Sequence, residues 1–152
     1  MNNSQDHYRR VASAMRVFNA GSDRLRATLA AKLGIGTSEM RAMSFVEEAG
    51  MLTPKELSVL MDITTGSMTA MVDRLEAASM LARQPHPTDR RSILLTLTPA
   101  GLHATQWADG VFADAIAAVY QYDESRDAAG DAVFLETVGA ALNAAALVKQ
   151  EA

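Results

Sequence analysis

Residues 53–76, TPKELSVLMDITTGSMTAMVDRLE, carry two helix-start signals in close succession. In the first, Thr53 is suited to the N-cap, Pro54 to the first helical position, and Glu56 to completing a capping box. In the second, Thr64 follows an apolar residue and can cap another short helix. Two short capped helices about three residues apart predict a helix-turn-helix.

Each predicted helix has one apolar side, as a packed helix pair needs. Ile63 can act as the staple residue that packs on Met68 of the second helix. The apolar positions are Leu57, Leu60 and Met61 in the first helix, and Met68, Met71, Val72 and Leu75 in the second.

A β-hairpin is predicted directly downstream. Residues 81–84 form the first strand, the turn-rich residues 85–89 follow, and in residues 92–98 Ile93, Leu95 and Leu97 alternate with Ser92, Leu94, Thr96 and Thr98. Period-two alternation bounded by turn residues is typical of paired strands. The hairpin would therefore have a polar tip.

Long helices are predicted on both sides of this unit. One runs from Tyr8 to Gly34-Ile35-Gly36, and a second begins at Thr37 as cap and ends near Gly50. Thr98-Pro99 repeats the cap-plus-proline start and opens a fifth helix, which a polar break at 122–127 ends. The last helix has Asp127 and Asp131 near its start, Lys149 near its end, and the stripe Phe134, Val138, Leu142 and Ala145.

The predicted fold class is mainly α: a winged helix-turn-helix unit with a two-stranded β-wing, flanked by N- and C-terminal helices. The flanking helices have more apolar surface than a three-helix unit can cover, which indicates a second subunit. The expected divisions are a dimerisation helix at 1–36, the DNA-binding region at 37–98 and dimerisation helices at 99–152, within one compact domain.

Composition restricts the class further. No apolar run reaches the length of a membrane helix and no signal peptide is visible, so a cytoplasmic protein is expected. There are no cysteines, which excludes disulfides and thiolate metal sites. The net charge is −4, but residues 1–98 hold 12 Lys/Arg against 10 Asp/Glu and residues 99–152 hold 2 against 8. A basic face on the first two thirds therefore remains compatible with DNA.

Candidate DNA-binding residues gather on the second helix of the pair and at the hairpin. Small hydroxyl side chains at a helix start, with arginines nearby, suit contacts to phosphates and base edges. The candidates are Thr64, Thr65, Gly66, Ser67, Thr69, Ala70, Arg74, Arg83, Asp89, Arg90 and Arg91. Asp89 could orient one wing guanidinium. The competing interpretations are a simple helix cap and a solvated turn.

Four blocks resemble the signature of MarR-type regulators: residues 52–57, 69–76, 87–91 and 97–101. The resemblance covers about residues 52–101, and their combination is more specific than any one block. It implies a homodimer whose N- and C-terminal helices form an intertwined dimerisation region. Its recognition helices, residues 65–79, would enter successive major grooves, with Arg91, supported by Asp89, in the minor groove. Half-sites would then lie about one turn, ~34 Å, apart. Ser79 departs from the family pattern, which usually has Gly there.

The resemblance also implies a small amphipathic or aromatic effector. Its candidate site residues are Met15, Phe18, Met43, Phe45, His103 and Trp107, for each of which a plain core role is the alternative. No cofactor and no metal site is expected, since His7, His86 and His103 lack partners at ligand spacing. No catalytic motif indicates an enzyme. The alternative function is a winged-helix protein-interaction adaptor that does not bind DNA.

Overall fold

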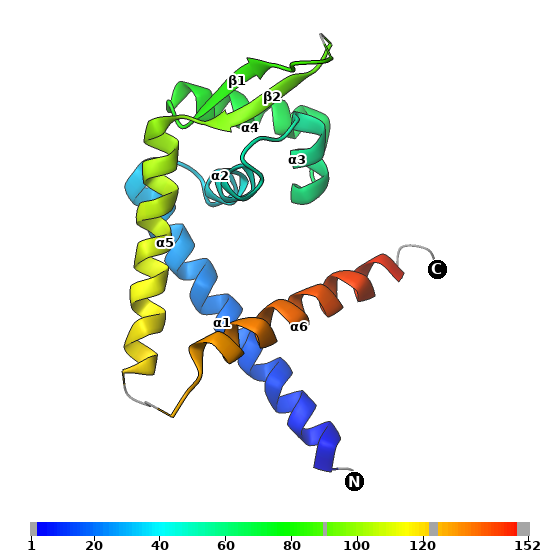
Figure 1. Cartoon of the computed structure of the whole chain (residues 1–152), viewed down its shortest axis with the longest axis vertical. Helices are drawn as coiled ribbons and strands as arrows, with labels where there is room; N and C mark the ends of the chain where they lie inside the picture. The colour runs from blue at the N-terminus through cyan, green and yellow to red at the C-terminus, as the bar shows by residue number, and fades with distance from the viewer. Residues whose placement is uncertain (1–2, 90, 122–124, 149–152) are drawn as a thin grey trace. The chain divides into compact units, whose positions relative to one another are not determined.

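The computed structural model describes residues 3–89, 91–121 and 125–148 and has the predicted mainly helical, winged architecture (Figure 1). It divides into two compact units, residues 1–112 and 113–152. The elements, in chain order, are α1 (Asn3–Leu33), α2 (Thr37–Ala49), α3 (Pro54–Met61), α4 (Thr65–Ala77), β1 (Leu81–Pro85), β2 (Ile93–Leu97), α5 (Pro99–Tyr120) and α6 (Ala128–Val148).

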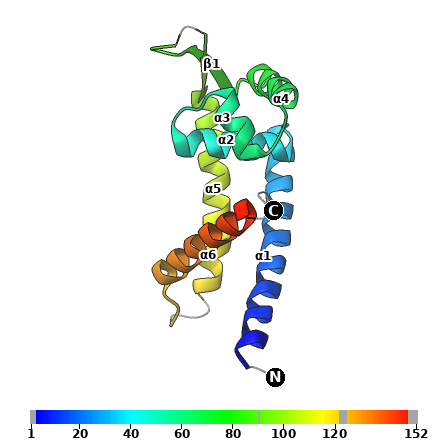
Figure 2. The same cartoon turned by 90° about the vertical axis from the view of Figure 1, so that its right-hand side faces the viewer.

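The core of the first unit lies among α2, α3, α4 and the wing, and Figure 2 shows the three helices gathered at one end of α1. The helix-turn-helix pair starts as predicted. The Thr53 hydroxyl accepts the Glu56 N–H, and the Glu56 carboxylate accepts the Thr53 N–H. The Thr64 hydroxyl accepts the Ser67 N–H. Among the described residues, the largest fully buried side chains are Met43, Val46, Leu57, Met68, Val72, Leu75 and Leu95.

The start of α2 differs from the prediction. Thr37 is its first helical residue, and Gly36 occupies the N-cap with an extended backbone. Glycine has no side chain with which to cap, and Glu39 instead turns back to accept the Gly36 N–H through Oε2. The start of α2 therefore lacks a side-chain cap, and the Glu39 carboxylate satisfies the N–H of the N-cap residue instead.

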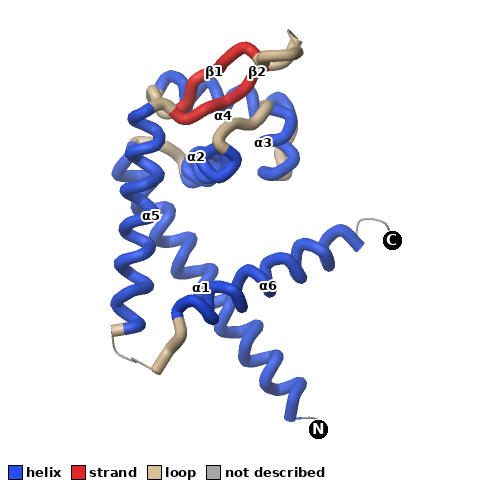
Figure 3. The backbone as a smooth tube through the Cα atoms, in the orientation of Figure 1, coloured by secondary structure: helices blue, strands red, loops and turns tan. Residues whose placement is uncertain are grey.

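The wing is an antiparallel pair in which Leu81 faces Leu97 and Pro85 faces Ile93 (Figure 3). Leu52 adds an isolated bridge to Leu95. The predicted alternation gives a fully buried Leu95, but Ile93 is 37% exposed. Ile93 pairs at the outer end of the hairpin, so the core covers only the inner part of the strand.

The wing joins α5 through a close backbone contact. Thr98 caps α5 by accepting the Gly101 N–H at 3.0 Å, as predicted. Its N–H donates to the Met80 carbonyl at 3.1 Å, and its hydroxyl donates to the Ser79 carbonyl at 2.6 Å. A Cβ built on Gly101 would lie 2.0 Å from the Met80 carbonyl oxygen. Only glycine therefore fits at position 101, in the first turn of α5.

The link between α4 and β1 includes a left-handed residue. Helix α4 ends at Ala77, two residues before the predicted end of the recognition helix, and Ser79 has φ +58°. A side chain in this conformation costs about 1 kcal/mol relative to glycine. Serine at position 79, in place of the glycine usual in the MarR-type pattern, therefore keeps the local fold but lowers its stability.

Replacing Ser79 with glycine should accordingly raise the free energy of unfolding by about 1 kcal/mol. The measurement is equilibrium unfolding in urea. Ala78→Gly is the matched control, because Ala78 has φ −79° and gains nothing from glycine there. A loss of stability in Ser79→Gly equal to that in Ala78→Gly would contradict this account.

The second unit contains the end of α5 and α6. The Tyr120 hydroxyl donates to Asp131 Oδ2 at 2.9 Å, and Arg126 pairs with the same oxygen at 3.2 Å. Asp127 accepts the Ala129 N–H at the start of α6. The predicted apolar face of these helices remains open, because Ile116, Val119, Phe134 and Leu142 are exposed in the single chain. Lys149 and part of the polar break lie outside the described residues.

Candidate nucleic-acid interface

The first turns of α4 present small side chains to solvent. Thr65, Gly66, Ser67, Thr69 and Ala70 are all exposed, while Met68, Met71, Val72 and Leu75 form the opposite, buried side. A Cβ on Gly66 would meet nothing within 4 Å, so the space in front of this turn is open. The low profile of this face lets the helix backbone approach another surface closely.

Three hydroxyls at the start of α4 are already hydrogen-bonded to neighbouring groups. Thr64 Oγ1 caps the helix and also bonds to Ser67 Oγ at 3.0 Å. Thr69 Oγ1 donates to the Thr65 carbonyl at 3.0 Å. These bonds fix the orientations of the hydroxyls, and each oxygen keeps lone-pair capacity for a further donor.

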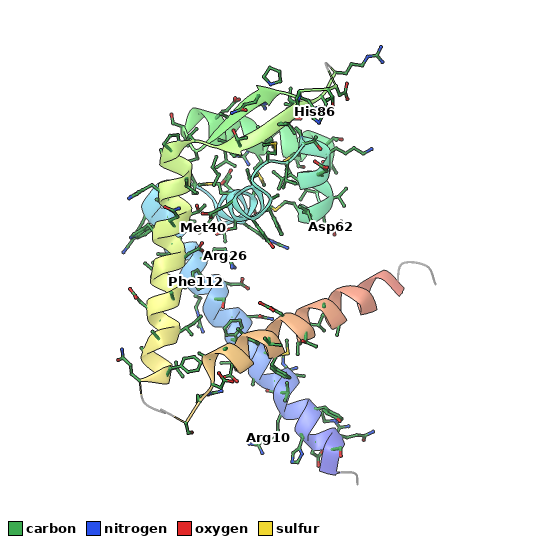
Figure 4. All side chains as sticks on the ribbon, viewed as in Figure 1. Arg10, Arg26, Met40, Asp62, His86 and Phe112 are labelled. Atoms are coloured by element: carbon green, nitrogen blue, oxygen red, sulfur yellow. The ribbon has the colours of Figure 1, made fainter. Side chains whose placement is uncertain are left out.

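The wing tip is organised by His86 and Asp89. The Nδ1 atom of His86 accepts the N–H groups of Thr88 at 3.3 Å and Asp89 at 3.1 Å, and Figure 4 shows His86 on the hairpin. Asp89 Oδ1 accepts the main-chain N–H of Arg91 at 3.0 Å. The predicted aspartate–guanidinium bond is thus, for Arg91, a bond to its backbone. Arg90 lies outside the described residues.

Sequence reasoning favoured a surface or capping role for His86 over a metal ligand, and the structure shows the partners of that role. A ring nitrogen that accepts two main-chain N–H groups must be unprotonated at Nδ1. His86 therefore acts as a turn-forming side chain, in the manner of Asn or Asp. Its position directly before Pro87 in the turn was the available signal.

Arg83 ties the wing to α4. Its guanidinium bonds to Asp73 Oδ1 at 2.6 Å and to Glu76 Oε2. Both carboxylates belong to α4, whereas Arg83 belongs to β1. The charge of this candidate DNA-binding residue is therefore already matched by two acids within the protein, and the bridge fixes the wing to the helix beside it.

Arg74 lies two turns along α4 from Ser67 and makes a different kind of pair. Its Nε atom is 2.5 Å from Oε1 of Glu39, which is 8% exposed and belongs to α2. The Arg74 side chain itself remains 60% exposed. The guanidinium is therefore held from one side and open on the other.

The candidate effector residues are divided among separate hollows. Met43 lines a cavity of about 140 Å³ among α1, α2 and α5, together with Arg26, Met40 and Phe112, which Figure 4 labels. His103 and Trp107 line another hollow beside Met80. Phe45 is half-buried under the Arg41 guanidinium, whose central carbon lies 5.5 Å from the ring centroid. Met15 is half-buried on α1 and Phe18 is exposed there.

Asp109 lies at the edge of the 140 Å³ cavity. Asp109 is exposed as a residue, but partial desolvation of its carboxyl at the cavity edge raises the pKa above the ordinary 3.8, and the charge of Glu47 raises it further. The folded chain therefore binds this proton more tightly than the unfolded chain does. Ionised Asp109 lowers stability at neutral pH, and this penalty disappears below pH 3.8, where both states are protonated.

Asp109→Asn should accordingly raise the melting temperature at pH 7 and leave it nearly unchanged at pH 3. Thermal unfolding followed at both pH values provides the measurement. Asp114→Asn makes the same charge change further along α5 and controls for net charge. An equal rise in both variants, or a rise at pH 3 alone, would contradict the assignment.

Among the described residues, no three His, Asp or Glu side chains come together as metal ligands do. In the same part of the chain, no helix combines the length and apolar character that a bilayer crossing requires.

Comparison with known proteins gives one consistent result. A model of the MarR family matches residues 33–92. The multiple antibiotic resistance protein MarR of Salmonella typhimurium is 34% identical over 83 residues, which cover 55% of this chain and 58% of that protein. The chain thus matches less than two thirds of the length of this curated relative.

Solved structures extend the similarity to the fold as a whole. RV1404 from Mycobacterium tuberculosis aligns with a TM-score of 0.71 and 22% identity, covering 93% of this chain and 96% of that one. A mutant MarR from Escherichia coli, solved in complex with operator DNA, aligns with a TM-score of 0.61 and 20% identity, covering 93% and 99%. The fold, with its helices and two-stranded wing, is therefore shared with these proteins.

Proposed function

We propose that the chain is a MarR-type winged helix-turn-helix transcriptional regulator rather than an enzyme, and that it binds duplex DNA as a homodimer on a pseudo-palindromic operator. One observation carries the proposal: an exposed, small-residue start of α4 with a wing fixed beside it by Arg83. Such a helix suits the major groove, and an arginine-bearing hairpin suits the adjacent minor groove. Occupation of an operator would make the protein a repressor that acts in the cytoplasm.

The dimer is proposed from apolar surface that the single chain leaves open. In the first unit, Tyr8, Val11, Val17 and Phe18 are exposed along α1, and the second unit exposes the faces described above. Apolar faces of this extent are typical of subunit interfaces. We assign dimerisation to residues 1–36 and 99–152, and DNA binding to residues 37–98.

Selection of bound sequences from random duplex DNA tests the proposal. A homodimer with two recognition helices should recover an approximate palindrome with half-sites about one turn, ~34 Å, apart. Size measurement by light scattering should give twice the mass of the chain. A monomer, or a protein without salt-sensitive affinity for any duplex, would instead favour the protein-interaction adaptor.

Release by a small amphipathic or aromatic ligand is the further part of the proposal. The cavity among α1, α2 and α5 combines Arg26 and Thr105 with apolar walls, and its volume of about 140 Å³ suits only a small molecule. Competition of candidate aromatic acids with bound duplex tests this part. A set of such compounds that changes neither DNA affinity nor melting temperature would argue against it.

Arg91→Ala should weaken binding to all duplexes about tenfold, because it removes a contact to phosphate or minor groove from each subunit. The slope of log affinity against log salt should become less steep by about 2, one unit for each lost contact. The control is Arg10→Ala, since Arg10 lies at the end of α1 remote from the wing (Figure 4). An unchanged slope in Arg91→Ala would count against a DNA contact by Arg91.

A further inference from the structure

We propose that Glu39 is a positioning residue for DNA binding, which holds Arg74 so that the outer guanidinium nitrogens face the duplex backbone. The inference rests on the proposed function and adds a residue to it that does not itself touch DNA. Within the pair, Glu39 on α2 is the fixed partner and Arg74 on α4 makes the contact with DNA.

The geometry of the pair is specific. Both carboxylate oxygens of Glu39 are in use, because Oε2 accepts the Gly36 N–H and Oε1 lies 2.5 Å from Arg74 Nε. The Glu39 side chain is 10% exposed and the Arg74 side chain 60%. Glu39 therefore binds the inner nitrogen of the guanidinium from within the protein. The exposed part of the same group remains available to an external anion.

Glu39 pairs with Arg74 although two other carboxylates lie nearer to Arg74 in the sequence. Asp73 precedes Arg74 and Glu76 follows two residues later, but Arg83 holds both of these carboxylates. The acid that reaches Arg74 comes instead from a helix 35 residues earlier in the chain. A free arginine samples many rotamers, and a side chain ordered in advance loses less entropy when it binds.

Positioning and simple charge predict opposite effects of Glu39→Gln. Removing an acid near a DNA-binding face should tighten binding to a polyanion if only charge matters. If Glu39 orients Arg74, the same change should weaken binding. Glutamine can still accept the Gly36 N–H through its single amide oxygen. With that oxygen directed at Gly36, the amide nitrogen takes the place of Oε1 beside Arg74 Nε, and an amide nitrogen cannot accept a hydrogen bond.

The experiment measures affinity for a duplex recovered by selection and for a scrambled duplex of the same length. Glu39→Gln should bind the selected duplex two- to tenfold more weakly, the range expected for ordering one rotamer-rich side chain. Glu48→Gln is the matched control, because it makes the same charge change at the exposed far end of α2. This control should bind as the wild type does or slightly more tightly.

A double-mutant cycle with Arg74→Gln shows whether Glu39 acts through Arg74. In the Arg74→Gln background, Glu39→Gln should cause no further weakening. The Nε–H signal of Arg74 in NMR spectra gives a readout without DNA: it should be protected from exchange in the wild type and lose that protection in Glu39→Gln. Melting temperatures identify any variant that fails to fold, and the NMR comparison then decides the geometry.

Two results would overturn the inference while leaving the proposed function in place. One is Glu39→Gln binding as tightly as Glu48→Gln, and the other is an equal loss whether or not Arg74 is present. Failure of the wild type to bind any duplex would instead remove the proposed function itself, and the positioning role with it.

Discussion

Gly101→Ala should lower the free energy of unfolding by about 3 kcal/mol, at the upper end of the cost of overpacking. The new methyl group would lie 2.0 Å from the Met80 carbonyl oxygen and 3.0 Å from the carbonyl carbon. These atoms cannot rotate away as the end of a side chain can, because they belong to the backbone and the same carbonyl accepts the Thr98 N–H at 3.1 Å. The root of the wing and the first turn of α5 must therefore separate.

Thermal unfolding should show this as a fall of roughly 10 °C in the melting temperature for a chain of this size. Gly110→Ala is the matched control, since it lies in the same helix and its added Cβ would meet nothing within 4 Å. That variant should gain roughly 0.5–1 kcal/mol from the helix preference of alanine. Equal effects at the two positions would show that the close contact at Gly101 has no energetic weight.

Thr69→Phe should reduce affinity for a selected duplex about 100-fold and affinity for random duplex only slightly. Thr69 is exposed on the open face of α4, next to the small Ala70. A ring there would hold the helix away from the groove floor, and each of the two helices would lose base contacts worth about 1–3 kcal/mol. Contacts to phosphates at the edges of the groove would largely remain.

Thr28→Phe provides the control for this variant. Thr28 is also exposed on a helix and makes the same hydroxyl-to-carbonyl bond, to Arg24 at 3.0 Å instead of to Thr65. Its affinity for the selected duplex should stay close to that of the wild type. A Thr69→Phe variant that loses the same factor on selected and random duplexes would show that this face does not read base sequence.

The features predicted correctly from the sequence depend on interactions between near neighbours. The caps at Thr53, Thr64 and Thr98 each involve residues three apart, and their signals survive in any tertiary context. The cap of α2 was assigned to Thr37 because a hydroxyl is a better acceptor than glycine. In the structure Gly36 is the N-cap residue and has no side chain to cap the helix, while the Glu39 carboxylate accepts the Gly36 N–H.

The arginines show where sequence reasoning ends. Their positions on α4 and the wing could be predicted, but their partners could not, because Glu39 lies 35 residues from Arg74 and Asp73 lies 10 residues from Arg83. The period of a helix or strand relates only near neighbours, so it does not identify partners that are this far apart in the sequence. Likewise, the sequence marked an aspartate at the wing tip, but only the backbone path shows that it bonds to the Arg91 N–H.

The double bridge from Arg83 to α4 has a mechanical consequence. Because one guanidinium is fastened to two acids on successive turns, the hairpin cannot swing independently of the helix beside it. A ligand, or a change in the angle between subunits, that rotates α4 must therefore rotate the hairpin by the same amount. In each subunit of a dimer, α4 and the wing would then bind or leave the DNA half-site together, as one rigid body.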